Sequence, residues 1–395
     1  MIYLDNAATT NIDPNVLDAM LPYLKDNYGN AGSIYSIGRD AKNAIEFARS
    51  QVAKMIDAEP KSIIFTSGGT ESNNLAIRGV AMYMIKSGKN TVITSEIEHD
   101  SVTTSVDRLV QMSKMCSTNR LYLKKIKTNE YGECNVHELD SFSKENNVGL
   151  VSIMYVNNET GSENDVAYIG DVCKKNGWIF HTDCVQAAGS HKINVNDIGC
   201  NMLSISSHKI HGPKGIGALY VDPKLVKKML PIICGGSHQE FGLRGGTENV
   251  AGIVGFGKAC EIAEKEFRED MVRMSILKQI FYVTLMRELA ENDLQGVVHI
   301  NGEKIIRPGK ILNLRFDGID SETLVLLLDS NGVAVSSGSA CRSHDLSPSH
   351  VLKAMGLSNE EAGNSIRVSF SKTNTDEEVV DAARIVATCV KELLR

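Results

Sequence analysis

The sequence lacks the features of a membrane protein, a secreted protein or a nucleic-acid-binding protein. No apolar run approaches the roughly 20 residues needed to cross a bilayer. Residues 1–5 have neither the basic nor the apolar region of a secretory signal peptide. No stretch of five basic residues occurs, and the net charge is −6, which argues against a nucleic-acid surface. We therefore expect a cytoplasmic protein that binds neither membranes nor nucleic acids.

The cysteines also lack a recognisable pattern. They number nine, and none of them forms a C-x-x-C pair or another spacing typical of a metal site, so we expect no metal. Scattered cysteines are typical of a reducing cytosol, where most of them are small apolar core residues. The 42% apolar and 23% charged residues are ordinary for a soluble globular protein, and 395 residues suffice for a large core and two domains.

What the sequence does contain is a repeated alternation of strands and helices. The predicted strands are apolar along most of their length, and they lie at residues 62–66, 91–95, 121–126, 148–156, 178–181, 202–206 and 216–221. Near-continuous apolar strands that alternate with helices are typical of a mainly parallel sheet covered by helices on both faces. The predicted fold class is therefore α/β.

A second, smaller α/β domain is predicted toward the C-terminus. The chain becomes polar and rich in glycine at residues 235–246, and a long helical stretch at about 250–291 then leads to the second domain. Beyond this stretch, helices alternate with short strands at residues 297–300, 311–316, 333–335 and 365–369. A capping box at residues 375–378 begins the last helix.

Polar residues follow several strands of the first domain. Ligands of a parallel α/β sheet bind outside the carboxyl ends of its strands, so these residues form the candidate site. They are Gly69, Thr70, His99, Asn157, Asn158, Asp183, Gln186, Ser206, His208 and Lys209.

Lys209 follows the strand at residues 202–206, in a turn closed by glycine and proline. A lysine at the end of a buried strand is partly desolvated, which favours the neutral amine that attacks a carbonyl to form a Schiff base. The alternative is an ordinary solvated loop lysine.

A phosphate site is predicted where a helix opens directly after a strand. Gly69 and Thr70 place backbone N–H groups and a hydroxyl at this point, as a phosphate requires. Ser206 and His208 would add donors to the same phosphate. The alternative is that the glycines only form a turn.

Two further residues fit a pyridine ring. Asp183 ends a buried strand, where a carboxylate needs a partner such as a protonated pyridine nitrogen, unless it caps a helix near Val185. His99 is either a structural histidine or an aromatic face stacked on a planar cofactor. An amine, a carboxylate, a ring-stacking histidine and a phosphate site are together the requirements of pyridoxal 5′-phosphate (PLP).

Two candidates lie in the second domain. Residues 336–343 are small apart from Cys341 and Arg342, so we expect a mobile loop that presents a thiol. The adjacent arginine would favour the nucleophilic thiolate, although an incidental loop cysteine is the alternative. Arg367 interrupts an apolar strand and would either clamp a substrate carboxylate or form a structural salt bridge.

These motifs together resemble the group I (NifS/IscS-type) cysteine desulfurases. The matching stretches follow the family's order over nearly the whole chain, at residues 3–10, 66–73, 98–99, 156–159, 181–186, 206–217, 242–249 and 336–341. The last of them separates the chain from group II enzymes, whose cysteine loop is shorter.

The resemblance implies a PLP enzyme of fold type I and a homodimer. Its large domain would comprise residues 13–257 and a seven-stranded sheet. Residues 1–12 and 258–395 would form the small domain, which carries the cysteine loop at about 336–347. The activity implied is the conversion of L-cysteine to L-alanine, with a persulfide left on Cys341 for sulfur acceptors in iron–sulfur cluster assembly, tRNA thiolation or another delivery route.

The resemblance also implies a role for each site residue. Lys209 would be the Schiff-base lysine and proton carrier, Asp183 the partner of the pyridine nitrogen and Gln186 that of the phenolate oxygen. His99 would stack on the ring and assist acid–base steps. The phosphate would be held beside Gly69 by Thr70, Ser206 and His208, and by Thr247 from the other subunit. Asn158 and Arg367 would bind the substrate carboxylate.

Some features depart from the family pattern. Arg342 stands where a small or hydroxyl residue is usual, and Tyr35 stands at a position commonly held by histidine. The chain ends at Arg395 without the extension through which IscS-type members engage a scaffold, so the sulfur acceptor is left open. Three alternatives also remain: a selenocysteine lyase, an aminotransferase, and a PLP-binding platform for sulfur acceptors with little turnover.

Overall fold

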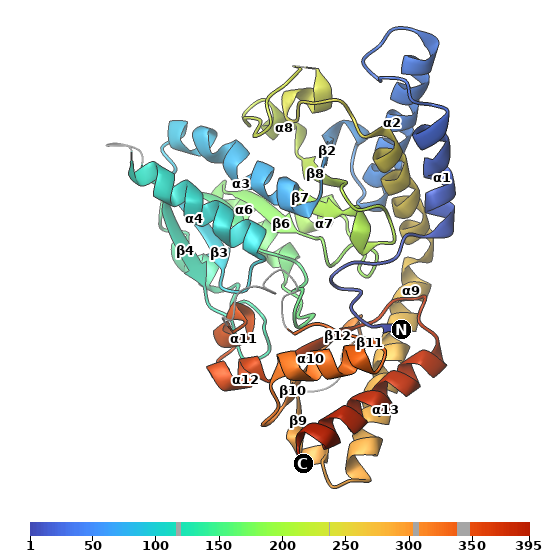
Figure 1. Ribbon diagram of the computed structural model, residues 1–395. Helices are drawn as coiled ribbons and strands as arrows, with labels where there is room; N and C mark the ends of the chain where they lie inside the picture. The colour runs from blue at the N-terminus through green and yellow to red at the C-terminus, as the bar shows by residue number, and fades with distance from the viewer. Residues whose placement is uncertain (116–119, 237, 303–307, 338–347) are drawn as a thin grey trace.

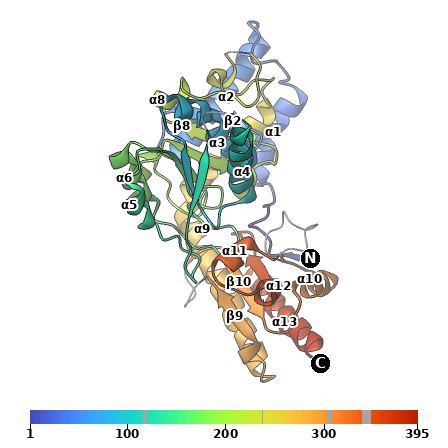
Figure 2. The same ribbon diagram turned by 90° about the vertical axis from the view of Figure 1, so that its left-hand side faces the viewer.

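The protein has two parts, each built around its own sheet and joined by the long helix α9 (Val250–Ala290) (Figure 1). This computed structural model describes residues 1–115, 120–236, 238–302, 308–337 and 348–395. The side view shows the two parts stacked along α9 (Figure 2). Within the described ranges, no helix is both long enough and apolar enough to span a membrane.

The larger sheet confirms the predicted fold class. Its seven strands are arranged in the order β2 (Ile63–Thr66), β8 (Gly217–Val221), β7 (Met202–Ser206), β6 (Ile179–Asp183), β5 (Val148–Ser152), β3 (Thr91–Ser95) and β4 (Tyr122–Ile126). The five strands from β7 to β4 pair in parallel, whereas β8 is antiparallel to both of its neighbours. The connection from β7 to β8 is too short for a crossover helix, which explains the antiparallel pairing.

Helices cover both faces of this sheet because its strands are apolar on both sides. In β2, Ile64 joins one apolar cluster while its neighbours Ile63 and Phe65 join another. The Ile64 cluster contains residues of α3 (Gly69–Lys86), α4 (Asp100–Lys114) and α8 (Pro223–Val226). The opposite cluster contains residues of α1 (Pro14–Lys25), α2 (Ser36–Met55), α5 (Glu138–Phe142), α6 (Val166–Asn176), α7 (Val195–Ile198) and the first turns of α9.

The smaller part has its own apolar core. Its antiparallel sheet has the order β12 (Ser365–Ser369), β10 (Ile311–Phe316) and β9 (Val298–Asn301), and a separate parallel pair joins β1 (Ile2–Tyr3) to β11 (Val333–Ala334). This core is completed by α10 (Ser321–Ser330), α13 (Asp376–Leu393) and the later turns of α9. Leu4 also lies in this core, so the N-terminal arm belongs with the C-terminal segment in space.

One short segment of the C-terminal region packs on the larger part. Val351 and Leu352 of α11 (His350–Ala354) and Ala362 of α12 (Asn359–Gly363) belong to the same apolar cluster as α2 and α6. Helix α9 also runs without a break across the predicted boundary at residues 257 and 258. The division into residues 13–257 and residues 1–12 with 258–395 therefore remains a prediction.

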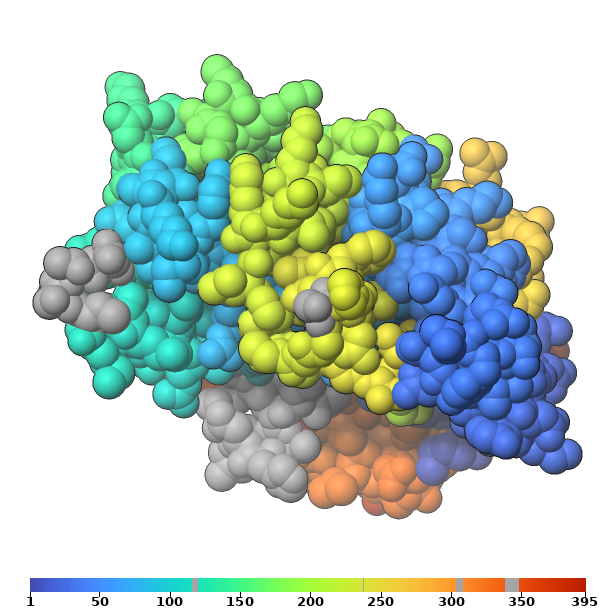
Figure 3. Space-filling model, turned by 90° about the horizontal axis from the view of Figure 1, so that it is seen from above, coloured from blue at the N-terminus to red at the C-terminus, as the bar shows by residue number. Residues whose placement is uncertain are grey.

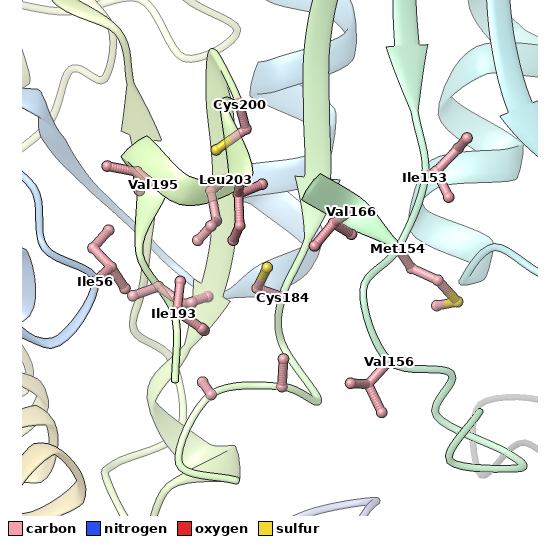
Figure 4. Packing of buried hydrophobic residues seen from close by; sticks show 14 of the residues in the cluster. Ile56, Ile153, Met154, Val156, Val166, Cys184, Ile193, Val195, Cys200 and Leu203 are labelled. Carbon is pink, nitrogen blue, oxygen red and sulfur yellow. The ribbon is translucent and has the colours of Figure 1, made fainter. Parts of the chain in front are cut away.

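The cysteines of the described ranges are core residues, apart from the exposed Cys234. Figure 4 shows Cys184 and Cys200 among Ile193, Val195 and Leu203. Burial raises the pKa of the Cys200 thiol to about 12 and that of Cys184 well above its ordinary value. These thiols are therefore protonated and chemically inert at neutral pH.

Candidate active site

One cavity lies where the carboxyl ends of the central strands meet the smaller part of the molecule. It is open to solvent, and the empty space within it and at its mouth amounts to about 940 Å³. The predicted site residues that line it are Gly69, Thr70, His99, Asn158, Asp183, Gln186, Ser206, His208, Lys209 and Arg367. The strand ends thus bring together residues that are far apart in the sequence, as expected for a parallel sheet.

Lys209 ends a short 3₁₀ turn, Ser207–Lys209, directly after β7. Its Nζ donates hydrogen bonds to the carbonyl oxygens of Ala7 at 2.5 Å and Ala8 at 2.7 Å. The N–H and hydroxyl of Thr10 both donate to the carbonyl oxygen of His208 at 3.0 Å. The N-terminal arm therefore forms one wall of the cavity and holds the lysine amine there, rather than leaving it solvated.

The phosphate site predicted at the start of α3 has the expected local geometry. Gly68 adopts a φ of 153°, a conformation that favours glycine, and the helix begins at Gly69. A Cβ on Gly69 would lie 2.7 Å from Cγ2 of Val185, so a larger residue would close this approach. The hydroxyl of Ser206 is buried and has no hydrogen-bond partner among the described residues. An anion at this helix N-terminus would provide one.

Burial also controls the charge of His208. It lowers the pKa of His208 to about 4, and the nearby positive charge of Lys209 acts in the same direction. At neutral pH the ring is therefore uncharged, and it contacts the hydroxyl of Thr9 through Nδ1 at 3.2 Å. A neutral ring has one N–H group, at either Nε2 or Nδ1, so it can donate one hydrogen bond to a bound anion.

Asp183 is the last residue of β6, and it is buried. Its Oδ2 accepts a hydrogen bond from Nδ2 of Asn73 at 2.6 Å, and its Oδ1 accepts from the N–H of Val185 at 2.9 Å. The helix expected near Val185 does not form, because residues 185–190 are a series of turns. Capping of that helix is therefore not the role of this carboxylate.

Gln186 presents one satisfied and one unsatisfied polar atom to the site. Its Nε2 donates to the carbonyl oxygen of Ala7 at 2.9 Å. Its Oε1 is buried and has no hydrogen-bond partner among the described residues. A buried amide oxygen without a partner is costly, so a donor supplied by a ligand would be favourable here.

His99 is the N-cap of α4. Its Nδ1 accepts the backbone N–H of Ser101 at 3.1 Å and lies 2.8 Å from the Ser101 hydroxyl. The ring thus lies at the N-terminus of α4, where the backbone N–H and the hydroxyl of Ser101 both fix its orientation.

Arg367 combines the two interpretations that the sequence left open. Its side chain is buried on β12, and Nη2 forms a salt bridge with Oδ1 of Asp5 at 2.8 Å. Nη1 donates to the carbonyl oxygen of Asn158 at 2.8 Å, while Nε is buried without a partner among the described residues. The guanidinium is therefore held in place by two partners, and its Nε–H is available to donate a hydrogen bond to an anion.

Among the described residues, two of those predicted, Asn157 and Thr247, do not line this cavity. Thr247 is exposed in the loop before α9 and does not line it. Cys341 and Arg342 lie outside the described residues. The last described residues before them include Ser336, which pairs with the backbone of Arg367, and the chain resumes at residue 348, just before the cavity-lining His350. Both flanks of the cysteine-containing stretch thus lie at the cavity.

The sequence interpretation missed four residues of this region: Asn73, Glu98, Ser101 and His350. Glu98 is fully buried, and the Nε2–H of His350 donates to its carbonyl oxygen at 3.0 Å. His350 lines the cavity and follows the N-cap Ser349, which donates to Glu159 at 2.5 Å. The only sequence signal for His350 was a histidine at a helix start soon after Cys341.

The geometry defines a class of site: an amine, a buried carboxylate and a helix N-terminus beside a hydroxyl without a partner among the described residues, all around one cavity of an α/β fold. The comparisons with known proteins identify the family. The chain belongs to the aminotransferase class-V family, whose model matches residues 2–381. This family is PLP-dependent, and the comparison confirms the family resemblance that the sequence motifs indicated.

Several relatives are similar over the whole chain. The cysteine desulfurase IscS of Methanosarcina thermophila is 40% identical over 99% of this chain and 92% of its own length. A cysteine desulfurase of Nostoc sp. is 39% identical over 100% of this chain and 94% of its own. Among solved structures, a NifS-like protein superposes with a TM-score of 0.88 at 33% identity, covering 99% of both chains. SspA in complex with cysteine has a TM-score of 0.78 at 31% identity, covering 95% of this chain and 100% of that one.

Proposed function

We propose that this protein is a PLP-dependent cysteine desulfurase, which converts L-cysteine to L-alanine and keeps the sulfur as a persulfide on Cys341. The observation that carries the proposal is the single cavity that joins Lys209, Asp183 and the start of α3, with both flanks of the Cys341 stretch beside it. The cysteine desulfurases described above, similar over nearly the full chain, support the same activity.

The cavity fits PLP because buried polar atoms there have no partner among the described residues. Ser206 Oγ would bind the phosphate with Thr70, His208 and the N–H groups of α3. Gln186 would donate the second hydrogen of Nε2 to the phenolate oxygen, because that oxygen only accepts. Asp183 would hold the proton of the pyridine nitrogen, with His99 against the ring. When bound, PLP supplies an electron sink for the bonds broken at Cα and Cβ of the substrate.

The chain's own residues would bind and orient the substrate. Arg367 has a buried Nε without a partner among the described residues, and with Asn158 it would bind the carboxylate of L-cysteine. Lys209 would carry the proton at Cα, since its amine is held in the cavity by carbonyl oxygens of the arm.

Cys341 would take the sulfur. Its thiolate attacks the sulfur of the substrate, an S–S bond forms and the Cβ–S bond breaks, with the electron pair of that bond left on carbon. Protons taken up by the carbon skeleton complete L-alanine. One L-cysteine and one enzyme thiol thus give one L-alanine and one enzyme persulfide, with no other oxidant or reductant.

The test is alanine release from L-cysteine by the purified protein, in the presence of an acceptor thiol. We predict that Cys341→Ala lowers the rate by about 100-fold or more, because the nucleophile is lost. Cys234→Ala is the matched control, because Cys234 is also a free cysteine but is exposed and outside the cavity, and it should keep the wild-type rate. An unchanged rate in Cys341→Ala would exclude the proposed role of this thiol.

The same assay separates the alternatives. A selenocysteine lyase would turn over selenocysteine far faster than cysteine, and an aminotransferase would need a keto acid. A binding platform would release no alanine with or without the acceptor thiol.

We also propose that the protein is a cytoplasmic homodimer that passes sulfur to an acceptor protein. Seen from above, α1, α2 and the segment at residues 221–249 lie on one face (Figure 3). These segments carry exposed apolar side chains, among them Leu21, Leu24, Ile37, Phe47 and Phe241. A large exposed apolar patch is typical of a protein interface. Thr247 lies in the same segment, from which it would reach the partner's phosphate site.

A further inference from the structure

A line of hydrogen bonds runs along the cavity wall from Asp183 to His99. Nδ2 of Asn73 donates to Oδ2 of Asp183 at 2.6 Å and to Oγ of Ser101 at 2.8 Å. Oγ of Ser101 in turn lies 2.8 Å from Nδ1 of His99. All four residues line the cavity, and Asn73 and Ser101 are buried.

The chemistry of the partners fixes the direction of these hydrogen bonds. An ionised carboxylate oxygen only accepts, so the atom of Asn73 that faces Asp183 must be the amide nitrogen. Its second hydrogen then points to Ser101. The amide oxygen of Asn73 is buried and has no partner among the described residues, so this side chain acts only as a donor of two hydrogen bonds.

The same logic determines which nitrogen of His99 carries the hydrogen. The backbone N–H of Ser101 donates to Nδ1 at 3.1 Å, and a backbone amide nitrogen cannot accept. The Ser101 hydroxyl already receives the Asn73 hydrogen bond, so its own hydrogen is available for Nδ1 as well. Nδ1 must therefore present its lone pair, and the hydrogen of the neutral ring lies on Nε2.

We propose that Asn73 and Ser101 are positioning residues that hold His99 as the Nε2–H tautomer and join its ring to the Asp183 carboxylate. The proposal rests on the proposed function, in which His99 and Asp183 contact the same cofactor. It also narrows the role of His99. A neutral ring with hydrogen on Nε2 donates a hydrogen bond there but has no lone pair at that atom to take a proton, which leaves proton transfer at Cα to Lys209.

The first test reads the tautomer directly. The full-length protein labelled with ¹⁵N-histidine is measured by NMR with and without PLP, and the His99 signals are identified by their loss in His99→Gln. We expect a lone-pair nitrogen at Nδ1 and a protonated nitrogen at Nε2 in both states. Ser101→Ala removes the hydroxyl donor to Nδ1 but keeps the backbone N–H donor, so it should raise the population of the Nδ1–H tautomer measurably without making it dominant. Asn73→Ala should have the same effect to a smaller extent. A hydrogen on Nδ1 in the wild type would overturn the proposal.

The second test measures the rate of alanine formation over a series of L-cysteine concentrations, which gives both kcat and KM. Ser101→Ala and Asn73→Ala should each lower kcat by about tenfold, equivalent to about 1.4 kcal/mol, with little change in KM. Ser101→Thr retains a hydroxyl at this position and should therefore keep most of the wild-type kcat. Asn74→Ala is the matched control, since Asn74 is the next residue on α3 but is partly exposed and donates instead to the carbonyl oxygen of Thr70 at 2.9 Å.

The outcomes separate this proposal from the proposed function. If the wild type releases no alanine, the proposed function fails, while the NMR measurement still tests the tautomer. If Ser101→Ala and Asn73→Ala keep both the wild-type tautomer and the wild-type kcat, the positioning role is wrong even for an active desulfurase. Loss of activity with an unchanged tautomer would also contradict it, because a merely structural role would then suffice.

Discussion

Glu98 is fully buried next to His99, and its surroundings change its charge. Burial raises the pKa of its carboxyl group from 4.5 to about 8, and the charge of Asp183 acts in the same direction. Ser95 and the N–H of Met154 donate to Oε1, whereas Oε2 has no partner among the described residues. The carboxyl group therefore keeps its proton at neutral pH in the folded protein, whereas the unfolded chain has released it.

This difference in proton binding predicts a pH dependence of stability. The contribution of Glu98 is fully present below pH 4.5 and is lost as the pH rises through 8. Between these values the free energy of unfolding of the wild type should fall, relative to that of Glu98→Gln, by up to about 1.4 kcal/mol per pH unit. Urea unfolding of both proteins at a series of pH values measures the two slopes. Glu96→Gln is the control, because Glu96 is two residues away and partly exposed, and it should keep the wild-type slope. Equal slopes for the wild type and Glu98→Gln would contradict the prediction.

At the scale of single residues, the sequence predicted the site residues that follow strands and missed the residues that hydrogen-bond to them. Lys209 and Asp183 could be found because Asp183 ends a recognisable strand and Lys209 follows one within three residues. Asn73 could not, because it lies within α3 and meets Asp183 only in the folded chain, 110 residues later. A contact of this kind depends on how α3 lies across the sheet, which no local pattern encodes.

At the scale of elements, one buried ion pair joins α2, β2 and the turn before α9. Nη1 and Nη2 of Arg49 each donate to a carboxylate oxygen of Glu240 at 2.8 Å, and Nη1 also donates to the carbonyl oxygen of Ile63. Glu240 in turn accepts the N–H of Phe65 at 2.6 Å. Glu240 and its neighbour Phe241 have positive φ values of 42° and 56°, so the pair holds a strained turn in place.

Removing one partner of this pair should be strongly destabilising. We expect Arg49→Met to lower the free energy of unfolding by about 3–5 kcal/mol, because the Glu240 carboxylate would remain buried without its counter-ion. Lys54→Met on the same helix is the control, since it breaks the exposed pair with Glu264 and should cost at most about 1 kcal/mol. Urea unfolding compares the two variants, and similar losses for both would show that the buried pair has no special role.

The elements themselves were largely predictable, with an informative exception. The seven strands of the large sheet and helix α9 lie close to their predicted positions because their apolar patterns are long and regular. The strand predicted at residues 148–156 ends at Ser152. Beyond it, Ile153 and Tyr155 still donate to the carbonyl oxygens of His181 and Asp183 on one side. On the other side, side chains take the place of a strand: Glu98 accepts the N–H of Met154, and Asn164 donates to its carbonyl oxygen. A hydrophobic pattern cannot distinguish these two kinds of partner.

At the scale of the whole molecule, the exposed apolar side chains of α1, α2 and residues 221–249 predict a homodimer. These three segments lie on one face of the molecule (Figure 3). Leu24 on α1 is 62% exposed, so Leu24→Asp should not disturb the core but should place a charge in the interface. We expect sedimentation velocity to show a dimer for the wild type and a larger monomer fraction for this variant. Val283→Asp, at a 59% exposed position on α9 away from this face, should remain dimeric. A monomeric wild type, or a fully dimeric Leu24→Asp, would contradict the prediction.

The N-terminal arm has a consequence for how the protein is made. Its residues leave the ribosome well before their partners: Asn6 donates to the carbonyl oxygen of Ser369, 363 residues later, and Ala7 accepts from Lys209, 202 residues later. Strand β1 likewise pairs with β11, about 330 residues later. Contacts between such distant residues form late in folding. The cavity wall that holds Lys209 is therefore completed only after nearly the whole chain has been synthesised, so a nascent chain cannot have a finished active site.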